Sequence, residues 1–300
     1  MDAAASVAPV TVQARAKINL ALHVIGQRAD GYHELDSLVV FAREGDRLDI
    51  APSSTDRLEL TGDFGHRLPA GSDNIVLKAL NAARTVLDAA GHRLPPQAVR
   101  LTKNLPPSSG IGGGSADAAA LLRLFAERQP SCAKDLRIAA LSLGADVPMC
   151  MDGANARVRG IGELSTALLI TAPIFVLLVN PRVEVPTPAV FSALLRRDNE
   201  PLPDLPDEGF AVPSALADYL RLCRNDLMPP AVALEPVIGE ALEAVERSDP
   251  LLARMSGSGA TVFGLFGSEN GCRLAAERIA ARHPGWWVRA TAISTEASHV

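Results

Sequence analysis

Hydrophobic side chains occupy every second position from Ile18 to Val24. This period of two is typical of a β-strand and places Lys17 and Asn19 together on its polar face. Alternation or short apolar runs predict further strands at residues 35–41, 46–51, 57–60, 99–103, 175–179, 261–266 and 286–293. Apolar positions at helical spacing predict helices between Asp73 and Gly91 and at residues 116–127, 216–222, 235–246 and 272–282.

This order of elements indicates an α+β architecture in two lobes. We expect the lobes to cover residues 1–160 and 161–300, with the boundary between Gly153 and Pro173. The second lobe contains a charged connector at residues 196–213 that is punctuated by prolines.

Composition narrows the class of protein. The 300 residues are 48% hydrophobic and 21% charged, which is ordinary for a globular chain. The net charge of −5 provides no overall basic field, so we expect neither nucleic acid nor a membrane surface as a partner. Residues 167–179 form the most apolar stretch, too short to span a bilayer, and residues 1–10 do not resemble a signal peptide. Four widely spaced cysteines are typical of a reduced, cytoplasmic protein.

A glycine-rich loop between a predicted strand and a predicted helix is the strongest chemical signal. Residues 106–115 read Pro-Pro-Ser-Ser-Gly-Ile-Gly-Gly-Gly-Ser. Glycines let the backbone approach a ligand closely, and the N–H groups at the start of a helix attract anions. No lysine follows as in a Walker loop, and Ser115 stands where the dinucleotide fingerprint needs glycine. The alternative is a flexible turn.

The segment from Leu105 to Ala120 resembles the phosphate-binding motif of the GHMP kinases. Other segments similar to this family are residues 16–20, 26–35, 144–148, 186–191 and 254–260, so the resemblance spans about residues 14–266. The loop departs from the usual pattern at Ser108, Ser109 and Ala116. The resemblance implies an N-terminal lobe like ribosomal protein S5, a ferredoxin-like C-terminal lobe, and an active site in the cleft between them.

The resemblance also implies two catalytic residues. Asp146 would be the base and Lys17 its partner beside the reacting hydroxyl and phosphate. A carboxylate next to an ammonium group stays ionised at neutral pH, and the ammonium can stabilise charge on the phosphoryl group. Without that resemblance, Asp146 reads as a turn residue before Val147 and Lys17 as a solvated strand lysine.

The same resemblance assigns binding residues. ATP would be held by Asn74, Lys103, Pro106, Ser109, Gly110, Ile111, Gly112, Gly113, Gly114 and Ser115. For Asn74 and Lys103 a helix cap and a surface lysine remain open alternatives. The second substrate would be bound by Asn19, Tyr32, His33, Thr187 and Phe191, with Tyr32 and His33 on one face of a cytosine ring and Phe191 on the other.

The segment Gly31-Tyr32-His33 points to one branch of the family, whose substrate is CDP-methylerythritol. The implied reaction is ATP-dependent phosphorylation of its 2-hydroxyl in the non-mevalonate route to isoprenoid precursors. Mg²⁺ would arrive with ATP, because it prefers phosphate oxygens and water, and no metal site made by the protein alone is expected. The implied state is a monomer or weak homodimer. Alternatives are a GHMP kinase for homoserine or a mevalonate derivative, and a ligand sensor without chemistry.

Overall fold

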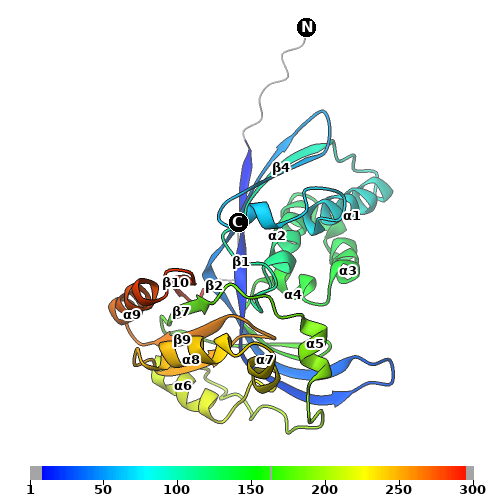
Figure 1. Cartoon of the computed structure of the whole chain (residues 1–300). Coiled ribbons are helices and arrows are strands. Elements are labelled where there is room, and N and C mark those ends of the chain that lie inside the picture. Colours follow the sequence, from blue (N-terminus) through cyan, green and yellow to red (C-terminus); the bar gives the residue numbers. More distant parts are fainter. Residues whose placement is uncertain (1–8, 163, 295–300) are drawn as a thin grey trace.

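The computed structural model describes residues 9–162 and 164–294, which form two sheets and their helices (Figure 1). The first sheet has the order β3-β4-β2-β5-β6, with β1 also paired to β2. Its strands are β1 (Val10–Gln27), β2 (His33–Pro52), β3 (Arg57–Thr61), β4 (Gln97–Thr102), β5 (Ala156–Gly160) and β6 (Leu164–Ala167). The second sheet has the order β10-β7-β9-β8, from β7 (Phe175–Asn180), β8 (Leu252–Met255), β9 (Val262–Phe266) and β10 (Trp287–Ala292). The α+β expectation is confirmed.

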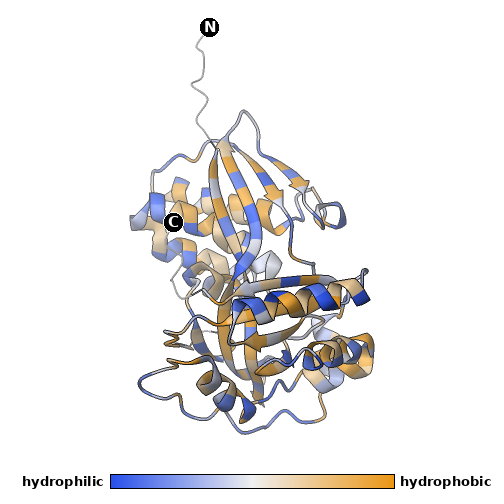
Figure 2. Ribbon diagram, turned by 90° about the vertical axis from the view of Figure 1, so that its left-hand side faces the viewer, coloured by the Kyte–Doolittle hydropathy of each residue, from blue (hydrophilic) through white to orange (hydrophobic). Residues whose placement is uncertain are grey.

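Helices of the first lobe cover one side of its sheet. They are α1 (Ile75–Ala89), α2 (Gly113–Arg128), α3 (Ala133–Leu143) and α4 (Val147–Asp152). The core between them and the sheet includes Leu48, Leu101, Leu80 and Phe125. Strands of this sheet alternate between hydrophobic and hydrophilic residues along their length (Figure 2), as a sheet covered on one face requires.

The second lobe repeats this layering with its own helices. They are α5 (Thr187–Ser192), α6 (Pro213–Arg221), α7 (Met228–Leu234), α8 (Val237–Glu246) and α9 (Glu269–Arg282). Helices α8 and α9 share a core with β7 and β9 that includes Val179, Val262, Ile238 and Ile279.

The β1–β2 hairpin connects the two lobes. Its paired residues run from Val10 and Ile50 to Gln27 and His33, and Figure 1 shows it passing from one lobe into the other. Ile18 and Val40 of the hairpin share a buried cluster with Leu178 of the second sheet. The first sheet ends at Ala167 and the second begins at Phe175.

The sequence-based elements differ from the structure in several places. The strands expected at residues 35–41 and 46–51 are one continuous strand, β2. Helix α2 begins at Gly113, within the glycine loop, rather than at residue 116. The short elements α3, α4, α5, α7, β5, β6 and β8 were not predicted.

Candidate active site

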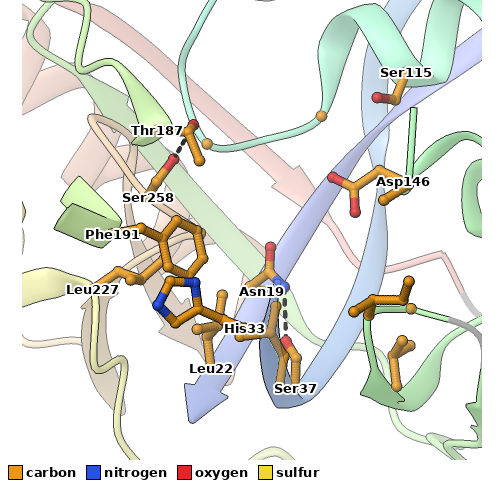
Figure 3. A pocket seen from close by; sticks show the side chains of 18 of the residues that line it. Asn19, Leu22, His33, Ser37, Ser115, Asp146, Thr187, Phe191, Leu227 and Ser258 are labelled. Atoms are coloured by element: carbon orange, nitrogen blue, oxygen red, sulfur yellow. Dashed lines mark hydrogen bonds between the residues drawn. The ribbon is translucent and has the colours of Figure 1, made fainter. Parts of the chain in front are cut away.

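A cavity of about 1020 Å³ brings together most of the residues that the sequence singled out. Its walls come from the β1–β2 hairpin, the glycine loop with the start of α2, the turn before α4, helix α5 and the loop after β8. The predicted residues that line it are Lys17, Asn19, Tyr32, His33, Ser109, Gly110, Gly112, Gly113, Gly114, Ser115, Asp146, Thr187 and Phe191. Figure 3 places Asp146 and Ser115 at one end and His33 with Phe191 at the other.

Lys17 and Asp146 form an ion pair at the first end. The Nζ atom of Lys17 lies 2.8 Å from Oδ2 of Asp146. The lysine side chain is 7% exposed and the aspartate side chain is 42% exposed. The ammonium group is therefore almost buried in the cavity wall, while the carboxylate is open to the cavity. The backbone N–H of Lys17 donates to the carbonyl of Ile111, which fixes β1 against the glycine loop. This pair offers both a proton acceptor and a positive charge to a bound reactant.

The first turn of α2 makes a cradle of backbone beside this pair. Gly112 adopts a left-handed conformation (φ 65°), and a Cβ there would lie 3.2 Å from the Cβ of Lys17. Gly114 faces open space, with only Ile75 within 4 Å of an added Cβ. N–H groups in the first turn of a helix have no intrahelical partner and carry partial positive charge. The cradle therefore fits a phosphate chain.

A second glycine loop, residues 256–259, packs against the first. The hydroxyl of Ser256 donates to the carbonyl of Gly110 at 2.9 Å and accepts from the N–H of Asn19 at 3.0 Å. A Cβ on Gly110 would collide with the Ser256 carbonyl, and one on Gly257 would lie 2.8 Å from the Gly110 carbonyl. These glycines allow two backbones from different lobes to touch.

Four predicted nucleotide contacts do not line the cavity: Asn74, Lys103, Pro106 and Ile111. Asn74 caps α1, where its Oδ1 accepts from the N–H of Val76 at 2.9 Å. Pro106 and Ile111 are buried at the base of the loop.

The side chain of Lys103 has a structural role, which corrects the expected nucleotide contact. It is 1% exposed, and its Nζ lies 2.5 Å from Asp46 and 2.6 Å from Asp117. A Cβ on Gly113 would lie 3.0 Å from this ammonium group, so Lys103 supports the cradle from beneath. Burial raises the pKa of Asp117 well above its usual range, against the opposing effect of Lys103.

Aromatic rings form the opposite end of the cavity. The His33 and Phe191 rings stack with centroids 4.7 Å apart and an interplanar angle of 28°, which is direct contact. No base fits between these two rings in this arrangement, unlike the expected order of ring, base and ring. Tyr32 is 60% exposed at the cavity edge. Thr187 shares a hydrogen bond with Ser258 at 2.8 Å.

His33 presents an unused polar atom. Its Nε2 is buried without a hydrogen-bond partner. Burial lowers the pKa of His33, and the nearby Arg197 guanidinium lowers it further. The imidazole is therefore neutral at pH 7, and one ring nitrogen can accept a hydrogen bond while the other donates.

Several lining residues were not predicted from sequence. Asn19 donates through Nδ2 to the Ser37 hydroxyl at 2.7 Å, so Ser37 orients a predicted residue (Figure 3). Ser37 lies inside an apolar run, and Arg197 lies in a charged connector that resembles solvated chain, so neither carried a signal of its own.

Comparisons with known proteins agree with this geometry. Residues 74–154 match the model of the GHMP kinases N terminal domain, and residues 212–284 match the GHMP kinases C terminal model. The chain belongs to the GHMP kinase family, which confirms the resemblance.

Its relatives place it further within that family. A 4-diphosphocytidyl-2-C-methyl-D-erythritol kinase of Cereibacter sphaeroides is 53% identical, over 92% of this chain and 96% of the relative. The enzyme of the same name from Mesorhizobium japonicum is 47% identical, over 96% and 97% of the two chains. A crystal structure titled 4-(cytidine 5'-diphospho)-2C-methyl-D-erythritol kinase superposes with a TM-score of 0.77 at 33% identity, over 95% of this chain and 99% of the other. A homoserine kinase of Cytophaga hutchinsonii, at 19% identity and a TM-score of 0.67, shares the fold.

Two features are absent from residues 9–162 and 164–294, the part of the chain that the structure describes. None of their helices is both long and apolar enough to cross a membrane. The same residues contain no group of three or more His, Cys, Asp or Glu side chains that could hold a metal ion.

Proposed function

We propose that this chain transfers the γ-phosphoryl group of ATP to the 2-hydroxyl of 4-diphosphocytidyl-2-C-methyl-D-erythritol, a step of the non-mevalonate route to isoprenoid precursors. The observation that carries the proposal is one cavity with the Lys17–Asp146 pair beside a phosphate cradle at one end and aromatic rings at the other. The relatives at about half identity bear the name of this activity.

Phosphoryl transfer requires mainly positioning and charge stabilisation. Asp146 accepts the proton of the attacking 2-hydroxyl as the new P–O bond forms, while the bond between the γ-phosphorus and the bridging oxygen of the β-phosphate breaks and ADP leaves. Lys17, held by Asp146 and the glycine loop, stabilises the negative charge on the transferred phosphoryl group. Asn19, oriented by Ser37, is within the same wall and positions the substrate.

The start of α2 would hold the phosphates of ATP through backbone N–H groups of Gly112, Gly113, Gly114 and Ser115. Magnesium bound to those phosphates would neutralise part of their charge. The protein ligand that we propose for it is the Ser115 hydroxyl, which lies in the cradle.

Base recognition falls to the other end of the cavity. A pyrimidine can stack on the exposed ring of Tyr32 and on the ring of Phe191. The unpartnered Nε2 atom of His33 then forms a hydrogen bond with the edge of the base. Thr187 lies beside this end and contacts the sugar alcohol.

The wider setting follows from the same proposal. We expect a cytoplasmic monomer or weak homodimer with its lobe boundary between Gly153 and Pro173, on the C-terminal side of β6, because β6 still belongs to the first sheet. Its partners are the two small substrates, not nucleic acid or membrane.

Two other functions remain to be tested against this one. A homoserine or mevalonate kinase would have no base for the aromatic end to bind. A sensor would need the phosphate cradle but not a carboxylate paired with lysine at the reacting position.

The deciding experiment measures ADP release by the purified protein with ATP, Mg²⁺ and one acceptor at a time. We expect turnover with CDP-methylerythritol and background rates with homoserine and mevalonate. Turnover with only homoserine or only mevalonate would show that the chain is a kinase for that acceptor and would overturn the proposal. Binding of ATP and CDP-methylerythritol without ADP release would support the sensor.

A further inference from the structure

Arg197 brings a positive charge to the aromatic end of the cavity. It lies in the segment after α5 (Thr187–Ser192), and its side chain lines the cavity together with His33 and Phe191. Its Nε atom is buried and has no hydrogen-bond partner. Across residues 9–162 and 164–294, no carboxylate forms a salt bridge with its guanidinium group. A guanidinium group in such surroundings retains donors that a ligand can use.

The chain on either side of Arg197 is fixed. Arg196 turns outward, where its side chain is 65% exposed and lies 3.1 Å from the Asp198 carboxylate. Asn199 donates to the carbonyl of Val24 from both its backbone N–H at 3.1 Å and its Nδ2 at 3.0 Å. The Asn199 amide also donates to Asp226 at 3.1 Å. These contacts tie the segment to β1 and hold Arg197 over the cavity.

The charges that line the cavity are distributed unevenly. Lys17 is already paired with Asp146 at the reacting end. His33 is neutral, because its pKa is lowered, and supplies no positive charge. Arg197 is therefore the cation available at the aromatic end among the lining residues that the structure describes. Arg197 is half-buried, and the planar fork of its guanidinium group matches phosphate oxygens.

We infer that Arg197 binds the diphosphate of the cytidine substrate through charge-assisted hydrogen bonds from its guanidinium group. This inference rests on the proposed function, since the diphosphate is the anionic group that such a substrate places next to its base. Arg197 thereby fixes the distance between the base end and the Lys17–Asp146 pair. It also selects a nucleoside diphosphate over an uncharged cytidine derivative.

The test compares binding of CDP and cytidine by titration calorimetry. A non-hydrolysable ATP analogue at saturating concentration keeps CDP out of the phosphate cradle. Four proteins are measured: the wild type, Arg197→Ala, Arg197→Lys and the matched control Arg196→Ala. Hydrogen bonds to charged groups predict that Arg197→Ala weakens CDP binding about 10- to 150-fold. Cytidine affinity should change less than about twofold, and Arg197→Lys should recover part of the loss as a point charge.

The control and the salt dependence sharpen the result. Arg196→Ala should match the wild type for both ligands, because Arg196 faces solvent. CDP binding by the wild type should weaken with added salt more steeply than binding by Arg197→Ala.

Equal weakening of CDP and cytidine by Arg197→Ala would overturn the inference in favour of a base contact or a folding role. An unchanged CDP affinity would overturn it outright. Failure of the proposed function is visible separately, in the wild type, as an absence of turnover with CDP-methylerythritol.

Discussion

The ion pair between Lys17 and Asp146 shows how a few side chains set the chemistry of the cavity. The lysine is almost buried and the carboxylate is open to the cavity, which is the arrangement that the proposed phosphoryl transfer requires. Both residues were identified from sequence motifs and not from hydropathy. Hydropathy alone would place Lys17 on a solvated strand face.

Replacement of either member should remove turnover and spare ATP binding. We expect Asp146→Asn and Lys17→Ala to lower kcat about 10²- to 10⁴-fold, the range for a positioned proton acceptor. ATP affinity should stay within a few-fold, because the backbone of α2 holds the phosphates. Asp152→Asn is a suitable control, since Asp152 is a similarly exposed carboxylate paired with Arg137. Wild-type turnover in the Asp146→Asn variant would exclude Asp146 as the base.

Phe191 should affect one substrate and not the other. Removing a stacking ring costs about 1–3 kcal/mol per base, so Phe191→Ala should raise the KM for CDP-methylerythritol roughly 5- to 150-fold. The KM for ATP should not change, because the cradle lies at the opposite end of the cavity. The measurement is one saturation curve for each substrate. A parallel rise in both KM values would mean that Phe191 supports the fold.

Lys103 is a residue that sequence reasoning placed incorrectly, although the pattern contained the information. Val99, Leu101 and Lys103 alternate along β4 and its end, so Lys103 points to the same core face as the two apolar residues. Asp46 stands in the same relation to Leu48 and Ile50 on β2. Two opposite charges that both alternate into a core are expected to pair.

Lys103→Met should lower stability severely. It leaves Asp46 and Asp117 buried without a counter-charge, and breaking such a pair costs about 3–5 kcal/mol. Burial alone would lower the pKa of Lys103, but the Asp117 and Asp46 carboxylates outweigh this effect and raise that pKa in the folded protein. The pairing therefore persists throughout neutral pH and is lost only as pH rises above the ordinary lysine range. Urea denaturation of the variant and of the exposed-site control Lys134→Met provides the comparison. Equal midpoints would show that this network adds little stability.

At the scale of elements, β2 is one long strand where the hydropathy pattern predicted two separate strands. Its first half pairs with β5 and its second half with β4, while β1 pairs along its length on the other edge, so one strand has three neighbours. Asp46, at the start of the second expected strand, is buried and paired with Lys103 rather than exposed. Hydropathy alone cannot distinguish a buried ion pair from a loop.

The glycine cradle allows a prediction that separates nucleotide binding from folding. An added side chain at Gly114 would stand in open space at the cradle, whereas one at Gly113 would press on the Lys103 ammonium. We expect Gly114→Val to weaken ATP binding roughly 10- to 100-fold through lost contacts to charged phosphates, with little change in Tm. Gly113→Val should cost about 1–3 kcal/mol of stability through overpacking.

Calorimetric ATP titration and thermal denaturation of both variants distinguish these effects. Gly285→Val, at a position with no neighbour within 4 Å, serves as the control. Unchanged ATP affinity in Gly114→Val would remove the cradle from the nucleotide site.

At the scale of the whole molecule, the active site depends on contacts between segments far apart in sequence. Ser256 and Gly110 are 146 residues apart, yet their hydrogen bond joins the two glycine loops. Local patterns predicted each loop but could not predict their contact, because hydropathy and spacing contain no information about which loops meet. The order of elements predicted two lobes, and the resemblance to the GHMP kinases added the expectation that the active site lies in the cleft between them.

Gly110→Ala should therefore damage stability and nucleotide binding together. Gly110 has a φ of 73°, and its Cβ would collide with the Ser256 carbonyl and lie 2.8 Å from Gly259. A strained left-handed residue costs about 1–3 kcal/mol before any collision is counted, so we expect a clear loss in Tm. Because the same loop continues into the first turn of α2, displacement of Gly110 should also weaken ATP binding.

The matched control is Gly71→Ala, since an added Cβ at Gly71 has no neighbour within 4 Å. Its Tm and ATP affinity should equal those of the wild type. If Gly110→Ala lost ATP affinity at an unchanged Tm, the loop would act on the nucleotide alone and the contact between lobes would be dispensable. A fall in both quantities, absent in Gly71→Ala, would mean that docking of the two lobes shapes the phosphate cradle.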